Sequence, residues 1–206
     1  MHLVCLDLEG VLIPEIWKGL AALTGIEALN RTTRDEPDYD VLMRYRLKIL
    51  DEHNIGMNEI RQVVAGMEPL DGALPLLQWL QSNTQVIILS DTFFEFAQPL
   101  LHKLGNPTIF CHSLKIEASG RIADYVLRQQ DQKRIAVNGL RALNYEVIAA
   151  GDSYNDLSML EAANDGILFR PPPAIVKDYP HYPVTHTYQE LADAFNRFLK
   201  ATPFAG

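Results

Sequence analysis

Short apolar runs alternate with amphipathic stretches along most of the chain. Runs of strand character cover residues 3–8, 85–91, 108–112, 146–152 and 166–169. Several of these runs are continuously apolar, which is typical of strands that are covered on both faces of a parallel sheet. Between them, apolar residues recur at helical spacing over 72–83, 95–105 and 132–144. This order predicts an α/β fold with a Rossmann-like, doubly wound parallel sheet.

Two stretches interrupt the alternation. Residues 14–70 hold several amphipathic segments and no convincing strand, which predicts a small helical cap inserted after the first strand. Between 114 and 126, Ser119 and Gly120 separate two short runs of strand character, which predicts a β-hairpin. We therefore expect a catalytic core domain formed by 1–13 and 71–206, and a helical cap domain formed by 14–70.

Composition narrows the class of partner. The chain has 206 residues, of which 48% are hydrophobic and 21% charged, with a net charge of -8. No run of Lys and Arg suggests a nucleic-acid or membrane surface, so a small-molecule partner is favoured. Neither a signal peptide nor a long apolar span is recognisable, which favours the cytoplasm. The sequence leaves a homodimer open.

Polar residues gather where the predicted strands end. Asp7 and Glu9 follow the first strand, Ser90 and Asp91 end the second, and Asp152 ends the fourth. Ligands of doubly wound sheets bind beyond the carboxyl ends of the strands, so these side chains are expected to share one site. Lys133 lies at the start of the helix that leads into the fourth strand.

These residue types suit phosphoryl transfer. Asp7 and Asp152 can share Mg²⁺, a hard cation that prefers carboxylate oxygens, and we include Glu9 among the expected metal ligands. Ser90 and nearby backbone N–H groups can hold phosphate oxygens, and Lys133 can add a compact positive charge. Asp7 can then attack phosphorus as a nucleophile, with Glu9 as general acid and base.

Four segments, taken in their order along the chain, make it resemble the haloacid dehalogenase superfamily of aspartate-nucleophile phosphotransferases. The matching segments are "DLEGVL", the serine of "ILSDT", Lys133 and "GDSYND". A helical insert directly after the first of them is similar to the small cap of the phosphoserine phosphatase branch. Within that branch, the chain looks most like bacterial phosphatases that also transfer phosphate to homoserine. The resemblance implies a Mg²⁺-dependent phosphoserine phosphatase that works through an aspartyl phosphate.

The resemblance also implies roles for further residues. Glu15 matches the glutamate that receives the substrate amino group, and Arg46 matches the arginine that binds the substrate carboxylate. Arg44 is the alternative for that second role. Asn155 matches a residue that contacts phosphate or substrate, and Asp156 matches one that orients the metal site.

Two positions depart from the family pattern. Most relatives have Asp where this chain has Glu9, whose side chain is one methylene longer. After Ser90 the branch has two glycines, whereas this chain has Asp91 and Thr92. Asp91 adds a carboxylate beside the expected phosphate pocket, and we include it among the substrate-binding residues. Both departures bear on the identity of the substrate more than on the type of reaction.

Two other functions stay open. The first is a phosphatase for a different small phosphomonoester, because cap residues alone set the specificity. The second is a non-catalytic module that accepts phosphate on Asp7 as a signal. Glu9 and the helical insert favour an enzyme, because a phosphate-accepting module needs neither an acid–base group nor a cap.

Overall fold

The computed structural model describes residues 1–32, 35–36 and 38–204. At its centre lies a seven-stranded sheet in the order β4-β3-β2-β1-β5-β6-β7. Neighbouring strands run parallel from β3 to β7, and β4 pairs with β3 in the antiparallel sense. The strands are β1 (His2–Leu6), β2 (Gln85–Phe93), β3 (Ile109–Ile116), β4 (Ile122–Val126), β5 (Glu146–Gly151), β6 (Asp165–Phe169) and β7 (Val184–Thr185). The predicted α/β fold is confirmed.

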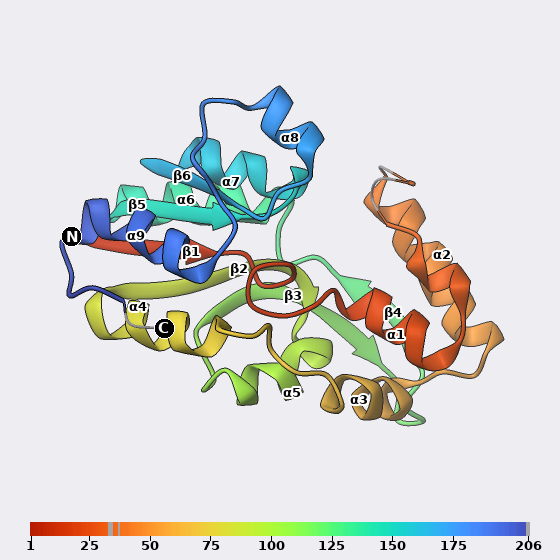
Figure 1. Cartoon of the computed structure of the whole chain (residues 1–206). Coiled ribbons are helices and arrows are strands. Elements are labelled where there is room, and N and C mark those ends of the chain that lie inside the picture. The colour runs from red at the N-terminus through yellow and green to blue at the C-terminus, as the bar shows by residue number, and fades with distance from the viewer. Residues whose placement is uncertain (33–34, 37, 205–206) are drawn as a thin grey trace.

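Helices cover both faces of this sheet (Figure 1). In β1, Val4 and Leu6 face one apolar cluster, whereas Leu3 and Cys5 face the other. The first cluster receives side chains from α4 (Ala73–Asn83), α5 (Phe94–Lys103) and α9 (Tyr188–Leu199). The second receives them from α6 (Gln132–Ala142), α7 (Leu157–Ala162) and α8 (Pro173–Asp178). Burial on both faces explains the continuously apolar strands seen in the sequence.

Between β1 and α4, the described residues form helices and no strand. These are α1 (Ile16–Thr24), the short 3₁₀ helix η1 (Glu27–Asn30), α2 (Tyr39–Glu52) and α3 (Met57–Ala65). Figure 1 shows α1, α2 and α3 together on one side of the molecule, beside the β3–β4 hairpin. Ile16 and Ile60 belong to the same apolar cluster as Leu6 of β1. The domain limits of 14–70 for the cap, with 1–13 and 71–206 for the core, stay a prediction.

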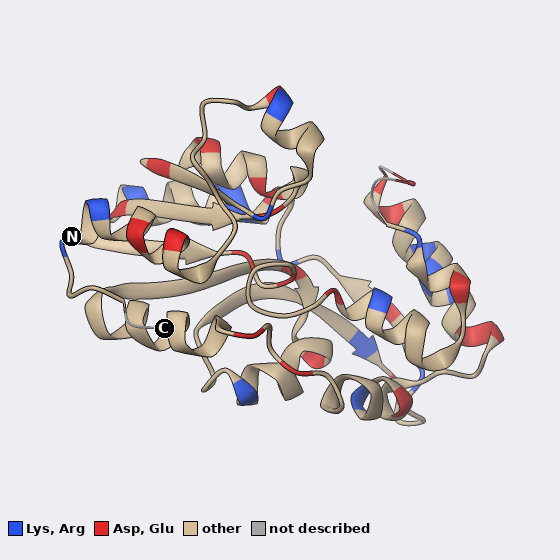
Figure 2. Ribbon diagram, in the orientation of Figure 1, with Lys and Arg blue, Asp and Glu red and all other residues tan. Residues whose placement is uncertain are grey.

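The hairpin holds helix α2 in place through charged pairs. Arg44 Nη1 lies 2.7 Å from Asp124 Oδ1 of β4. Further along α2, Asp51 accepts two hydrogen bonds from Arg121, at 2.9 and 2.7 Å. Figure 2 shows both signs of charge along α2. These exposed pairs join α2 to the hairpin, whereas the buried side of α2, which carries Met43, Arg46 and Leu47, faces the core.

Several details differ from the sequence prediction. The predicted third core strand and the first hairpin strand are one continuous strand, β3. The short helices α7 and α8, the short strand β7 and the helix α9 were not predicted. None of the helices within the described ranges has the length and apolar character needed to cross a membrane.

Candidate active site

Adjacent strand ends bring the predicted site residues together. Strand β1 lies between β2 and β5, and all three run in the same direction. Asp7 directly follows β1, and its N–H donates to the carbonyl oxygen of Ala150 in β5 at 3.0 Å. Ser90 lies within β2, and Asp152 directly follows β5. The carboxyl ends of three parallel strands therefore form one edge of the site.

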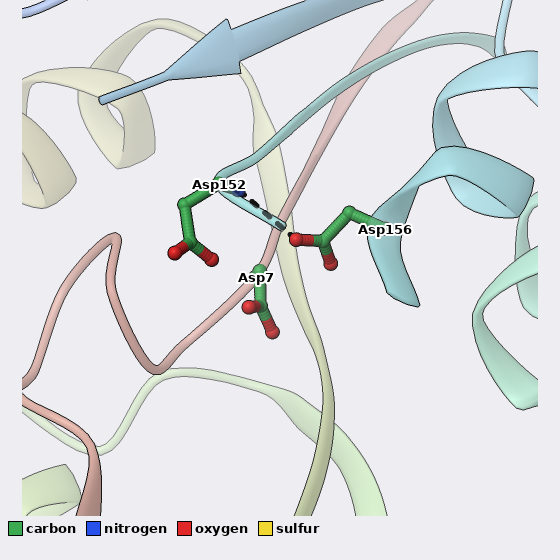
Figure 3. Close-up of side chains that lie close together, drawn as sticks. All are labelled: Asp7, Asp152 and Asp156. Carbon is green, nitrogen blue, oxygen red and sulfur yellow. Dashed lines mark hydrogen bonds between the residues drawn. The ribbon is translucent and has the colours of Figure 1, made fainter. Parts of the chain in front are cut away.

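A group of three carboxylates lies at this edge. One oxygen from each of Asp7, Asp152 and Asp156 lies within 4.8 Å of the others (Figure 3). Burial and the nearby Asp156 raise the pKa of Asp7 well above its ordinary value. Burial and Asp156 likewise raise the pKa of Asp152 to about 6. Carboxylates crowded in this way favour an added cation, which would restore their ordinary acidity.

Lys133 supplies a buried positive charge to this group. Its ammonium lies 2.9 Å from Asp7 Oδ1 and 2.7 Å from Asp156 Oδ1. Burial alone would lower the pKa of Lys133, but the attraction of Asp156, Asp7 and Asp91 raises it well above its usual range. Lys133 is therefore a permanent cation beside the Asp7 carboxylate.

Asp156 organises the loop that follows β5. Its Oδ2 accepts the backbone N–H groups of Asp152 and Ser153, at 3.0 and 3.1 Å. With Lys133 on Oδ1, both of its oxygens are engaged by the protein. This bonding fits a residue that orients the site, which is the role that the family resemblance implied for Asp156.

Gly10 allows the loop after β1 to approach Asp152. Its φ is +81°, and a Cβ at this position would lie 2.6 Å from the Asp152 carboxylate. Any other residue would therefore meet both a strained backbone and a clash. Replacing Gly10 with any other residue would therefore displace the Asp152 side chain.

Glu9 connects the site to the helical insert. Its Oε1 accepts the backbone N–H of Ile16, the first residue of α1, at 3.0 Å. Burial raises the pKa of Glu9 to about 7, although the hydrogen bond from Ile16 opposes this shift. Glu9 is not in the three-carboxylate group found among the described residues. Its assignment as a metal ligand stays a prediction.

A cavity of about 400 Å³ opens over these groups. The predicted site residues on its wall are Asp7, Glu9, Glu15, Arg46, Ser90, Asp91, Asp152 and Asn155. Lys133 reaches Asp7 from the α6 side, and a neighbouring cavity of about 570 Å³ is lined by Lys133 and also by Asp91 and Asn155. The fold thus brings every predicted site residue to one place.

The two candidate arginines differ in position. Arg46 is 7% exposed and lines the cavity, with its guanidinium 4.5 Å from the centre of the Trp17 ring. Its Nη2 donates to the Arg31 carbonyl oxygen at 2.8 Å, and its buried Nε has no hydrogen-bond partner among the described residues. Burial lowers the pKa of Arg46 to about 10. Arg44 is exposed and paired with Asp124 instead.

Two residues that contact Asp91 are not evident as site residues from the sequence. Gln132 is 2% exposed and bonds to the Asp91 carboxylate, and Tyr39 donates its hydroxyl to the Asp91 carbonyl oxygen at 3.2 Å. Gln132 lies in the polar run "QQDQKR", which gives no sign of burial. Tyr39 starts a helix whose place over the site depends on the whole insert.

The Asp91 carboxylate is an anion in this setting. Burial alone would raise its pKa, but Lys133 and hydrogen bonds from Asn155 and Gln132 bring it below its ordinary value. Asp91 therefore places a negative charge at the edge of the cavity.

Comparison with known proteins agrees with the sequence resemblance. Residues 1–164 match the family described as haloacid dehalogenase-like hydrolase. Phosphoserine phosphatase ThrH of Pseudomonas aeruginosa is 53% identical over 202 residues, which cover 98% of this chain and 97% of the relative. A phosphoserine phosphatase of Pseudomonas syringae pv. tomato is 51% identical, over 98% of this chain and 84% of the relative.

Solved structures share the fold at lower identity. A phosphoserine phosphatase in apo form superposes with a TM-score of 0.76 at 18% identity, covering 93% of this chain and 98% of the other. A phospho-aspartyl intermediate analogue of phosphoserine phosphatase gives a TM-score of 0.77 at 16% identity, over 94% and 98%. The chain belongs to the haloacid dehalogenase-like hydrolase family, within its phosphoserine phosphatase branch.

Proposed function

We propose that this protein hydrolyses O-phosphoserine through an aspartyl phosphate on Asp7, and that it can also transfer the phosphoryl group to homoserine. The observation that carries this proposal is Asp7, which lines the same cavity as Glu15 and Arg46 and lies 2.9 Å from the buried ammonium of Lys133. The 53% and 51% identical relatives, both named phosphoserine phosphatases, support the choice of substrate.

The donor set fits Mg²⁺. Asp7, Asp152 and Asp156 offer hard carboxylate oxygens within 4.8 Å of one another, and Lys133 alone does not balance their charge. Asp156 is already engaged by Lys133 and two backbone N–H groups. We therefore assign Asp7 and Asp152 as the carboxylates that would hold the ion. When bound, Mg²⁺ would offset negative charge on the phosphoryl oxygens.

In the first step, an Asp7 carboxylate oxygen attacks phosphorus and the bond from phosphorus to the serine oxygen breaks. Lys133, Ser90 and backbone N–H groups stabilise the charge on the phosphoryl oxygens. Glu9 gives its proton to the departing serine oxygen. A pKa of about 7 suits this role, because both protonation states of Glu9 are then available near neutral pH.

In the second step, water attacks phosphorus and gives a proton to Glu9, and the bond from phosphorus to Asp7 breaks. Inorganic phosphate and the free Asp7 carboxylate result. Homoserine can take the place of water, because it carries the same ammonium and carboxylate as serine and a hydroxyl one methylene further out. Its hydroxyl oxygen would then attack phosphorus, with Glu9 again taking the proton.

Two residues from the helical insert suit the amino-acid part of the substrate. Arg46 presents a buried guanidinium with an unpartnered Nε, which favours a carboxylate. Glu15 also lines the cavity, where it accepts a hydrogen bond from Lys18 at 2.6 Å. An α-ammonium group could take a similar place beside Glu15.

The test is ³¹P NMR of the purified protein with Mg²⁺, O-phosphoserine and homoserine. We expect phosphoserine to disappear, with inorganic phosphate and phosphohomoserine as products. Phosphate without phosphohomoserine would remove the transfer reaction and leave the hydrolase. Unchanged phosphoserine, with turnover of other phosphomonoesters, would point to a phosphatase of different specificity. Phosphate bound once per chain without release would indicate a phosphate-accepting module.

A further inference from the structure

The Asp91 carboxylate bonds to two other segments of the site. Its Oδ2 accepts from Asn155 Nδ2 at 3.0 Å, and its Oδ1 accepts from Gln132 Nε2 at 3.1 Å. Lys133 Nζ lies 3.7 Å from Oδ2. Asp91 itself belongs to β2, Gln132 and Lys133 begin α6, and Asn155 lies in the short 3₁₀ helix η2 (Tyr154–Asp156) that follows β5. One side chain therefore joins three segments that surround the Asp7 carboxylate.

Gln132 secures the α6 side of this connection. It is 2% exposed, and its Nε2 donates both to Asp91 and to the Ser90 carbonyl oxygen. Its Oε1 accepts from Arg128 Nε at 2.9 Å. These partners fix which end of the amide faces Asp91, because a carbonyl and a carboxylate both require a donor. The next residue, Lys133, is thereby held where it reaches Asp7.

Asn155 is held from two sides. Its Oδ1 accepts the hydroxyl of Ser153, and its Nδ2 donates to Asp91. Asn155 also lines the main cavity. Without Asp91, the amide would lose the partner that fixes its orientation toward that cavity.

The charge and bonding of Asp91 favour a contact with protein donors over a contact with the phosphate of the substrate. Each of its carboxylate oxygens already accepts a hydrogen bond from a protein amide. A carboxylate also repels a phosphate group, so direct contact would weaken the binding of a phosphomonoester. The same negative charge is favourable when Asp91 instead accepts hydrogen bonds from the amides of Gln132 and Asn155.

We propose that Asp91 is a positioning residue that fixes Asn155 and the start of α6 around the reacting phosphoryl group, without touching the substrate. This inference rests on the proposed phosphatase function and deepens it. It also assigns a role to the carboxylate that stands where the branch has a glycine.

A double-mutant cycle tests this role. Asp91→Ala, Asn155→Ala and the double variant are compared with wild type in Mg²⁺, with O-phosphoserine and separately with p-nitrophenyl phosphate. We expect each single change to lower kcat by about 10-fold or more, with KM for phosphoserine within about 3-fold of wild type. The double variant should lose clearly less than the product of the two single losses, because part of the effect of Asp91 passes through Asn155.

Two results would overturn the inference. One is a double variant whose loss equals the product of the two single losses, which indicates independent roles. The other is a raised KM with unchanged kcat in Asp91→Ala, which indicates a substrate-binding group. Asp91→Asn should recover part of the activity lost in Asp91→Ala, since its amide oxygen can still accept one hydrogen bond. If Asp91→Ala does not fold, the cycle is run with Asp91→Asn.

A matched control is available on α9. Asp193 Oδ1 accepts from Gln189 Nε2 at 3.1 Å, the same contact that Asp91 makes with Gln132, on an exposed helix surface. Asp193→Ala should therefore leave kcat and KM unchanged. Turnover of p-nitrophenyl phosphate distinguishes the claim about the substrate from the claim that Asp91 is a positioning residue. Wild-type turnover of p-nitrophenyl phosphate without turnover of phosphoserine would refute the proposed substrate, while the cycle could still be measured.

Discussion

Glu9 Oε1 accepts the backbone N–H of Ile16 at 3.0 Å, so the proposed general acid is bonded to the first residue of helix α1. A shorter aspartate side chain at this position would not span the same distance from an unchanged backbone. The extra methylene of Glu9, compared with an aspartate, thus has a structural use. It joins the acid at the end of β1 to the helical insert.

Two substitutions separate the chemistry of Glu9 from this contact. Glu9→Gln keeps an oxygen that can accept from Ile16 but cannot exchange a proton, so kcat should fall by about 10² to 10⁴. Glu9→Asp keeps the acid and loses the contact, so its loss should be smaller, less than about 10². Steady-state hydrolysis of phosphoserine measures both. Equal losses in the two variants would contradict the role of Glu9 as acid and base.

Arg46 and Arg44 form a matched pair on one helix. Arg46→Ala should lower kcat/KM for phosphoserine by roughly 100-fold, because the substrate carboxylate loses a buried charged partner. The same change should have little effect on phosphoethanolamine, which lacks that carboxylate. Arg44→Ala, which removes an exposed pair with Asp124, should leave both substrates within about 2-fold. A larger loss with Arg44→Ala would exchange the two assignments.

Gly10 offers a test of the metal site. Gly10→Ala should raise the Mg²⁺ concentration for half-maximal activity by about 10-fold, because the new Cβ displaces the Asp152 carboxylate. Gly105→Ala is the control, since Gly105 has a similar φ of +79° and nothing within 4 Å of a Cβ. Both variants should lose about 1–2 kcal/mol of stability from backbone strain. An unchanged Mg²⁺ requirement in Gly10→Ala would argue against Asp152 as a ligand.

Tyr188 of α9 braces the loop after β1 by donating its hydroxyl to the Val11 carbonyl oxygen at 2.7 Å. Tyr188→Phe should cost about 1–2 kcal/mol of unfolding free energy at pH 7. Burial raises the pKa of Tyr188 from 10.0 to about 12. The unfolded chain therefore releases this proton first, and the stabilisation present below pH 10 declines as the pH rises toward 12.

Urea unfolding of both proteins measures this effect. The difference in unfolding free energy between wild type and Tyr188→Phe should shrink by roughly 1 kcal/mol between pH 9 and pH 11. Comparing the two proteins removes the contribution of other groups that titrate in this range. A difference that stays constant would show that the Tyr188 hydroxyl titrates alike in both states.

Local patterns were enough to predict the fold and the strand-end residues of the candidate site, whereas Glu15, Arg46, Asn155 and Asp156 were assigned only through the family resemblance. Continuous apolar strands that end in Asp7, Ser90 and Asp152 predicted the parallel sheet and the shared edge, because parallel strands align their carboxyl ends. The sequence could not choose between Arg44 and Arg46 from the residues alone. That choice depends on which side of α2 faces the core, and the buried apolar residues Met43, Leu47 and Leu50 set that side.

Long-range hydrogen bonds account for what the sequence missed. Gln132 lies in a run of polar residues, yet its side chain is buried against Ser90 and Asp91, about forty positions away along the chain. The role of Asp91 was equally hidden, since its partners come from two other segments. The two-residue strand β7 is set by pairing with β6 and has no pattern of its own.

The most direct test of the mechanism is to trap the phosphorylated protein. Wild type and Asp7→Asn are mixed with ³²P-labelled phosphoserine and Mg²⁺, quenched in acid within a turnover, and analysed for label on the protein. We predict label on wild type that hydroxylamine releases, as expected of an acyl phosphate, and no label and no turnover in Asp7→Asn. Label or near-normal turnover in Asp7→Asn would contradict an aspartyl phosphate at Asp7.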